Sequence, residues 1–458
     1  MRSLLPVGLL VKYYLPDSQD HVDPSFNFET EKRDVLRRRQ RDDLYAHELL
    51  SERSFDGLLV SKGIVDGFGD TGSRYTLAHR HRLLRTGAQA FFRIKDCSWG
   101  GIPVMGDCGA FTYVREETPP YSVDDVIEFY LECGFNQGIS VDHVIFQYDP
   151  TWEVDGCTPP EVRDRQRITL DLADSFLQRC KTERVPFEPL GVAQGWGPKS
   201  YAHAVEELQR IGFDYIALGG MVPLKTPDIL TTLQSIASVR KPTTRLHLLG
   251  ISRTEHLRDF AQLGVYSFDS TSPLRQAFKD DKDNYYTLDR TYPAIRIPQV
   301  EGNAKLQKLI SSGKVSQEKA RALERACLNA MQKFDQEQAS VDEVVDLLVA
   351  YQRLCIEKAP EEERKRKKDY AEVYREVLEA RPWCNCSCDV CRELGHHVIL
   401  FRGAERNRRR GFHNINVFYR RLQAELGSGS AATTSKQARN TSASAERTYE
   451  ERTADSSH

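Results

Sequence analysis

Residues 187–220 read FEPLGVAQGWGPKSYAHAVEELQRIGFDYIALGG. Two short apolar runs, Phe187–Val192 and Tyr215–Leu218, flank the amphipathic stretch Tyr201–Ile211. The apolar runs predict buried strands, and the stretch between them predicts a helix that connects one strand to the next. This β-α-β unit predicts a parallel sheet with helices packed against it.

The same alternation extends from about residue 55 to about residue 290. The other predicted strands are Phe55–Val60, Ile102–Met105, Gln137–Val141, Leu246–Leu249 and Val265–Phe268. The other predicted helices are Ser122–Cys133, Arg163–Thr182, Asp228–Val239 and Thr254–Leu263. About seven or eight such units favour a closed (β/α)8 barrel of the TIM type. Periodicity does not demonstrate closure, so an open doubly wound sheet is the alternative.

With 458 residues, the chain has room for a barrel of about 250 residues and smaller units beside it. We expect the barrel, with an N-terminal extension, in residues 1–300. Apolar residues at helical spacing in Ser316–Tyr374 predict a helical insertion, residues 301–380. A zinc-binding subdomain is expected in residues 381–425. The Ser-, Thr-, Ala- and Gly-rich residues 426–458 predict a disordered tail.

The net charge of −2 argues against a protein that wraps nucleic acid by bulk charge, so any such contact must be local. The opening stretch MRSLLPVGLLVKYYLPD lacks the features of a signal peptide, and we expect no membrane span. Four of the 11 cysteines lie in residues 384–391 and the others are scattered. This pattern fits a reducing cytoplasm and one metal site better than a disulfide framework.

Residues 384–391 read CNCSCDVC, and His413 follows further along the chain. Cys386, Cys388, Cys391 and His413 form a complete ligand set for one tetrahedral Zn²⁺. Such a site has no open position for water, so we expect a structural zinc and seek the chemistry elsewhere. Cys384 is expected to be a spare thiol, with competition against Cys386 for the metal as the alternative.

Polar and small residues follow the predicted strands at the ends where a barrel gathers its active site. They are Asp107, Asp142, Gln194, Gly219, Gly220, Gly250 and Asp269. Glycine lets the backbone approach a ligand closely, with tight turns as the structural alternative. Carboxylates that converge on one face are costly unless they have a function, so this edge is the predicted active site.

The motifs occur in the order Asp107-Cys108-Gly109-Ala110-Phe111, Asp142, Val192-Ala193-Gln194-Gly195, Ala217-Leu218-Gly219-Gly220, Leu248-Leu249-Gly250, Phe268-Asp269 and the cysteine cluster. In this order they resemble the tRNA-guanine transglycosylase family, which includes the queuine and archaeosine tRNA-ribosyltransferases. The resemblance covers about residues 55–290 and 384–420. It implies a zinc-carrying (β/α)8 barrel, a pentosyltransferase that exchanges guanine in nucleic acid for a 7-deazaguanine base.

The resemblance also implies residue roles. Asp269 matches the nucleophile that attacks C1′ and holds the sugar as a covalent ester, with a helix N-cap as the structural alternative. Asp107 matches the general acid/base. Asp142 matches the carboxylate that reads the donor edge of the base, with Asp149 as the alternative. The other expected contacts with the base are Gln194, Gly219, Gly220, Phe111 and Leu249, the last two as apolar faces or as ordinary core.

Basic residues are expected to bind phosphates without sequence choice. Arg275 is in register with the family. Arg408, Arg409 and Arg410 lie close to His413 in sequence, and a merely solvated basic face is the alternative reading.

Several departures make the chain more similar to the DNA-modifying branch of the family, often called DpdA. Cys108-Gly109-Ala110 and Trp196 differ from the tRNA enzymes, and more than 100 residues separate Asp269 from Cys386. The phrases Lys12–Asp17, Tyr45–Glu48 and Ser140–His143 also look like that branch. This similarity implies insertion of 7-cyano-7-deazaguanine (preQ0) into DNA, with partner proteins of a DNA-modification cluster and a homodimer as further expectations. The alternatives are a tRNA enzyme, a non-catalytic zinc-braced nucleic-acid-binding protein and an unrelated barrel hydrolase.

Overall fold

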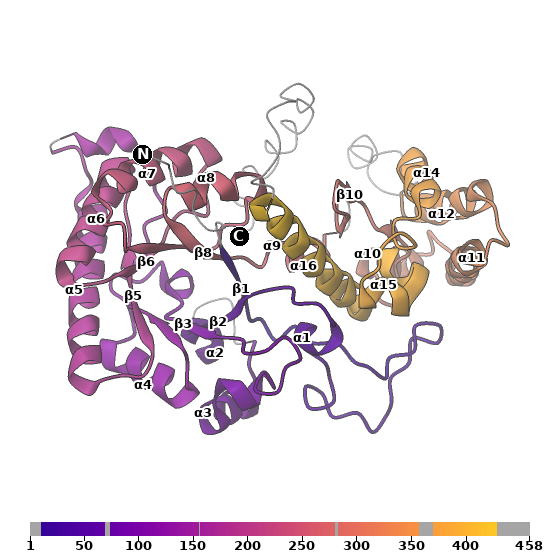
Figure 1. Ribbon diagram of the computed structural model, residues 1–458. Coiled ribbons are helices and arrows are strands. Elements are labelled where there is room, and N and C mark those ends of the chain that lie inside the picture. Colours follow the sequence, from indigo (N-terminus) through magenta and orange to yellow (C-terminus); the bar gives the residue numbers. More distant parts are fainter. Residues whose placement is uncertain (1–10, 69–73, 155, 280–282, 357–369, 428–458) are drawn as a thin grey trace.

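The computed structural model describes residues 11–68, 74–154, 156–279, 283–356 and 370–427. Eight parallel strands close into a barrel, with each strand paired to the next and β8 paired to β1 (Figure 1). The strands are β1 (Lys12–Pro16), β2 (Gly57–Ser61), β3 (Val104–Asp107), β4 (Gln137–Ile139), β5 (Glu188–Ala193), β6 (Tyr215–Leu218), β7 (Arg245–Leu248) and β8 (Val265–Asp269). This confirms the predicted (β/α)8 barrel and excludes the open sheet. Nearly all of the expected tail, residues 426–458, lies outside the described residues.

The first strand was not predicted from the sequence, which placed the start of the barrel near residue 55. β1 lies instead in the expected N-terminal extension and completes the barrel. Tyr14 pairs with Gly57 of β2 on one side and with Asp269 of β8 on the other. The apolar run of this five-residue strand, Tyr13–Leu15, is only three residues long, so the usual signal is weak.

Aromatic side chains cover the seam between β1 and β8. Tyr13 stacks on Phe268 with 5.3 Å between ring centroids. Phe418 of α16 (Gly403–Gly427) meets Tyr13 edge-on at 5.0 Å. The Tyr13 hydroxyl donates a hydrogen bond to the Ser270 carbonyl oxygen at 2.8 Å. The helix α16 therefore packs against the barrel where its first and last strands meet.

Helices surround the barrel on its outer face, and a separate apolar cluster fills its interior. The helices are α2 (Lys62–Asp66), α3 (Leu77–Phe91), α4 (Val123–Cys133), α5 (Pro160–Glu183), α6 (Pro198–Ile211), α7 (Thr226–Val239), α8 (Leu257–Gln262) and α9 (Ser272–Gln276). The interior cluster consists of Tyr14, Leu59, Met105, Ile139, Leu190, Val192, Tyr215 and Ala217. No helix among the described residues is long and apolar enough to cross a membrane.

Three short strands, β9 (Tyr285–Tyr286), β10 (Thr291–Tyr292) and β11 (Ile295–Arg296), follow the barrel, and the described residues from there to the cysteine cluster are mainly helical. They contain α10 (Ala304–Ser311), α11 (Gln317–Asp335), α12 (Val341–Ile356) and α14 (Tyr370–Ala380), followed by α15 (Asp389–Leu394). α12 packs against both α11 and α14. In Figure 1 this orange region lies beside the barrel, and the yellow helix α16 runs between the two. The position of α16 lets one helix contact both parts of the molecule.

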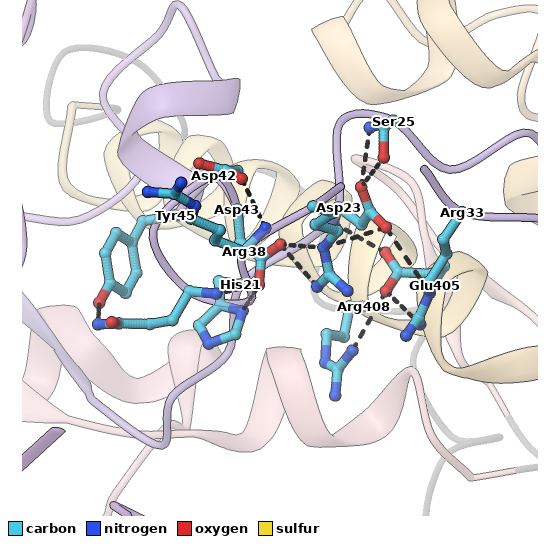
Figure 2. Close-up of polar contacts among 12 residues, drawn as sticks. His21, Asp23, Ser25, Arg33, Arg38, Asp42, Asp43, Tyr45, Glu405 and Arg408 are labelled. Carbon is cyan, nitrogen blue, oxygen red and sulfur yellow. Dashed lines mark hydrogen bonds and ion pairs between the residues drawn. The ribbon is translucent and has the colours of Figure 1, made fainter. Parts of the chain in front are cut away.

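A long irregular segment, residues 17–45, connects β1 to α1 (Ala46–Leu49) and packs against α16 through ion pairs (Figure 2). Asp23 and Asp43 are both fully buried, and the Arg37 guanidinium lies 3.1 Å from Asp23 and 2.6 Å from Asp43. Glu405 of α16 accepts from Arg33 at 2.9 Å and from Arg409 at 2.9 Å. Buried ion pairs of this kind fix one arrangement, because removing one partner leaves a charge buried without compensation.

The prediction that Arg409 and Arg410 present a basic face to phosphates is wrong. Arg409 is 1% exposed and Arg410 is fully buried. Arg409 donates to the Asp23 carbonyl oxygen at 2.7 Å, and Arg410 donates to the carbonyl oxygens of Leu400 at 2.9 Å and Ala277 at 2.6 Å. The guanidinium donors thus satisfy backbone groups inside the protein. Of the three predicted arginines, only Arg408 keeps partial exposure, with 25% of its side chain accessible.

Candidate active site

Three carboxyl groups meet at the carboxyl-terminal edge of the barrel. Asp107 is the last residue of β3, Asp142 lies in the loop after β4, and Asp269 is the last residue of β8. Burial raises the pKa of Asp107 to about 7, and the charges of Asp142 and Asp269 add to this shift. Hydrogen bonds from Ser61 and Gly109 oppose it only in part. Asp107 can therefore both release and take up a proton near neutral pH.

Asp142 is held by two side-chain donors. The Cys108 thiol donates to Oδ1 at 3.1 Å, and Nε2 of Gln194 donates to Oδ2 at 2.6 Å. The Tyr113 hydroxyl supports this arrangement by contacting the Cys108 sulfur at 3.1 Å. Burial raises the pKa of Asp142 to about 6, and the hydrogen bonds from Cys108 and Gln194 lower it. The structure thus gives the unusual Cys108 a direct partner in the site.

The Gln194 amide is fixed on both sides. Its Oε1 atom accepts from the Ile145 backbone N–H at 3.1 Å while its Nε2 atom donates to Asp142. The backbone of Gly219 lies so close that a Cβ atom there would collide with this amide. Gly220 follows with a φ of 70°, a conformation that favours glycine. Asp142, Gln194 and the two glycines therefore face one another.

The alternative carboxylate, Asp149, has a different place. Its Oδ1 atom accepts from the backbone N–H of Thr151 at 3.0 Å and from the Thr151 hydroxyl at 2.6 Å, which caps the short helix η2 (Pro150–Glu153). Asp142, and not Asp149, hydrogen-bonds Gln194.

Asp269 accepts hydrogen bonds at Oδ1 from two groups of the neighbouring strand end. The Gly250 backbone N–H lies at 3.0 Å and Nε2 of His247 lies at 3.2 Å. His247 is fully buried, and its Nδ1 atom lies 2.6 Å from the Ser267 hydroxyl, which in turn meets the Tyr215 hydroxyl. Because a carboxylate only accepts, the proton belongs on Nε2, and Nδ1 of that tautomer accepts from Ser267.

His247 was not among the predicted site residues. The available signal was a polar residue inside the apolar strand Arg245–Leu248, opposite Ser267 in the next strand. A buried histidine in such a place needs partners for both ring nitrogens. The spacing from His247 to Asp269 alone does not show that the two residues meet.

The predicted apolar residues lie at the same edge with different exposures. Phe111, in the short helix η1 (Ala110–Tyr113), is 65% exposed and meets Phe146 edge-on at 5.4 Å. Leu249 is partly buried and packs against the interior cluster of the barrel. An exposed aromatic face beside buried carboxylates is suited to a planar aromatic ligand.

Arg275, in the last turn of α9, approaches Asp20 at 3.6 Å. Asp20 follows β1 at the same edge of the barrel. Burial raises the pKa of Asp20, while Arg275, Arg408 and Arg74 lower it. Arg275 therefore lies close to one carboxylate next to the predicted active site, and the charges of Arg408 and Arg74 also act on it.

The four predicted metal ligands form one group. The Nδ1 atom of His413 lies 3.3 Å from the sulfurs of Cys388 and Cys391 and 3.6 Å from that of Cys386. All four ligand atoms lie within 4.8 Å of one another, so the group could hold a metal ion. Nε2 of His413 contacts the Tyr286 carbonyl oxygen at 2.7 Å, which leaves Nδ1 free for a metal. Cys384 is exposed and lies outside this group.

No family model matches the chain. A DNA-guanine transglycosylase of Salmonella montevideo is 49% identical over 418 residues, which cover 91% of this chain and 97% of that protein. A queuine tRNA-ribosyltransferase of Xylella fastidiosa (strain M23) is 26% identical over 47% of this chain and 62% of its own length. One of Pseudomonas aeruginosa (strain LESB58) is 25% identical over 45% of this chain and 60% of its own.

The raised pKa values of Asp107 and Asp142 predict how stability depends on pH. Both values, about 7 and about 6, exceed the value of about 3.9 expected for unfolded Asp. Between about pH 4 and about pH 7, the folded state therefore binds more protons than the unfolded state. Their contribution is complete below about pH 4 and is lost as the pH rises through about 7. The free energy of unfolding should therefore fall as the pH rises, and we expect Asp107→Asn to make this fall smaller by at most about 4 kcal/mol.

The measurement is urea unfolding at several pH values between 4 and 8. Asp149→Asn is the control, because it changes a carboxylate outside the group. An Asp107→Asn profile parallel to that of the unchanged protein would refute the assignment.

Proposed function

The chain belongs to the DNA-modifying branch of the tRNA-guanine transglycosylase family, and we propose that it exchanges guanine in DNA for a 7-deazaguanine base. The observation that carries this proposal is the 49% identity to a DNA-guanine transglycosylase over 91% of the chain. The similarity to the queuine enzymes covers less than half of the chain. We take preQ0 as the incoming base, and the partner proteins, the homodimer and the cytoplasmic location stay predictions.

The proposed chemistry proceeds in two displacements at C1′ of the target nucleotide. A carboxylate oxygen of Asp269 attacks C1′, the bond to N9 of guanine breaks, and Asp107 protonates the departing base. The incoming base then gives a proton to Asp107, and its N9 atom attacks C1′ and releases Asp269. The pKa of about 7 at Asp107 supports this double role, since a group at that pKa exchanges protons readily in both directions.

Asp142 and Gln194 are the proposed readers of the base. Guanine offers N1–H and an amino group as donors beside O6 as an acceptor, and a carboxylate beside a carboxamide complements that edge. The 2.6 Å hydrogen bond between Gln194 and Asp142 keeps the two groups side by side before any base arrives. The Gly219 and Gly220 backbone lets the base approach, and Phe111 and Leu249 supply its apolar faces.

The test of this function is base exchange by the purified protein. The protein is incubated with preQ0 and either duplex DNA or tRNA that carries labelled guanine. We expect label release from DNA, and Asp269→Asn should reduce it by about 1,000-fold or more because the covalent step is lost. Asp149→Asn serves as the control. Release from tRNA alone would support the tRNA enzyme, and DNA binding without exchange would support the non-catalytic alternative.

His247 is proposed to position Asp269. His247→Phe removes one of two donors to the nucleophile, so we expect kcat to fall by about 10- to 100-fold with an unchanged KM for the incoming base. His247→Gln, which keeps an N–H donor, should recover part of this loss. Equal losses in the two variants would instead indicate a role in packing, and thermal unfolding of each variant checks its stability.

The metal is proposed to be one structural zinc, held by Cys386, Cys388, Cys391 and His413. When bound, it would brace α15 and α16 against each other and supply no open site for chemistry.

We expect Cys388→Ser to lose bound zinc and to have a lower melting temperature. Cys384→Ser should keep the zinc and the melting temperature of the unchanged protein. Mass spectrometry measures the metal content, and calorimetry measures the melting temperature. Loss of zinc from Cys384→Ser would show that Cys384 is a ligand.

A further inference from the structure

The irregular segment between β1 and α1 exposes an apolar pair near its middle. Val35 is 95% exposed and Leu36 is 82% exposed, more than the other exposed large apolar residues of the described chain. Residues 17–45 contain only isolated bridges, between Val22 and Leu44 and between Asn27 and Lys32. Connections of this length inside a compact domain usually have a function of their own. The exposed pair therefore calls for a partner.

Cations flank the apolar pair. Lys32, Arg38, Arg39 and Arg41 are all exposed, and we call residues 32–41 the basic loop. The nearby acids Asp34 and Asp42 accept the backbone N–H groups of Leu36 at 2.8 Å and of Arg38 at 2.6 Å. These two carboxylates shape the turn, while the four cations project from it. The surface is thus apolar at its centre and positive around it.

The basic loop is anchored by the residues between its exposed cations. Arg37 bridges the buried Asp23 and Asp43. Gln40, which is buried, donates to the Tyr45 hydroxyl at 3.1 Å and accepts from Arg82 at 2.7 Å. Arg37 and Gln40 face inward, so Arg38 and Arg39 between them stay outside. Desolvating Asp23 and Asp43 is costly, and a mere connection between two strands would not need it.

The basic loop is continuous with the edge of the barrel that holds the active site. Its segment leaves β1 at Pro16, on the same edge as Asp269. Asp20 meets Arg275, and the charge of Arg408 also acts on Asp20. Burial lowers the pKa of His79 of α3, and the positive charge of Arg39 lowers it further. The segment that carries the basic loop therefore lies beside positive charges at the active-site edge, those of Arg275 and Arg408, and carries another at Arg39.

We propose that the basic loop binds the DNA duplex beside the target guanine. Arg38, Arg39 and Arg41 contact phosphates, and Val35 and Leu36 insert at a base step. This inference rests on the proposed function, because a guanine inside a duplex must leave the stack to reach Asp269. Apolar side chains flanked by arginines open or kink a duplex in this manner, at a cost repaid by the added contacts.

The phosphate contacts are tested by DNA binding at several salt concentrations, with a duplex that contains guanine. The plot of log affinity against log salt has a negative slope, to which each phosphate contact contributes about 0.9. Replacing Arg38, Arg39 and Arg41 with Gln should make this slope shallower by about 3. The matched control replaces Arg167, Arg179 and Arg210, which project from α5 and α6. An unchanged slope in the loop variant overturns the phosphate assignment.

The apolar pair is tested by base exchange on two substrates. Val35→Ser with Leu36→Ser should lower kcat/KM by about 10-fold on a fully paired duplex, because a wedge repays a few kcal/mol of unstacking. When the target guanine lies in an unpaired bubble, kcat/KM of the double variant should stay within about 2-fold of that of the unchanged protein. Leu131→Ser, on α4, is the control. Equal losses on both substrates overturn the wedge.

These outcomes are distinct from a failure of the proposed function. If the unchanged protein exchanges no guanine in any DNA, the DNA substrate itself is wrong. If it exchanges guanine in DNA and both loop variants match it, only the inference about the basic loop falls.

Discussion

Three carboxyl groups share one poorly solvated edge of the barrel, and the cost of burying their charges constrains the rest of the site. Burial raises the pKa of Asp107 and of Asp142, and the charges of Asp142 and Asp269 add to the shift of Asp107. Asp142 and Asp269 have different hydrogen-bond partners. Asp142 receives a thiol and an amide, whereas Asp269 receives a backbone N–H and an imidazole. This division gives three chemically equal side chains three different environments, as a proton donor, a base reader and a nucleophile require.

Helix α16 connects the site to the rest of the chain. Its Phe418 covers the barrel seam, its His413 belongs to the cysteine cluster, and its Glu405 pairs with the N-terminal segment. The buried arginines of the same helix tie these regions together through backbone carbonyls. Arg406, Arg409 and Arg410 of this helix are therefore structural residues inside the protein, although their sequence is strongly basic.

Much of the fold could be predicted because buried parallel strands have a strong local signal. The strand ends then located Asp107, Asp142, Gln194 and Asp269, which the structure brings to one edge. Three features could not be predicted, because each depends on contacts between distant residues. β1 becomes a strand only by pairing with β2 and β8, His247 becomes interesting only through Ser267 and Asp269, and Arg410 is buried only because Ala277 and Leu400 need donors.

The position of β1 also bears on how the chain folds. Because Tyr14 pairs with Asp269, β1 gains its second neighbour, β8, only after more than 250 further residues have been made. Contacts over such separations slow folding, and an unpaired strand edge is prone to wrong association. The aromatic contact of Phe418 with Tyr13 comes later still. The seam between β1 and β8 is therefore covered only after the chain has been made as far as Phe418, so closure of the barrel follows the synthesis of the helical region.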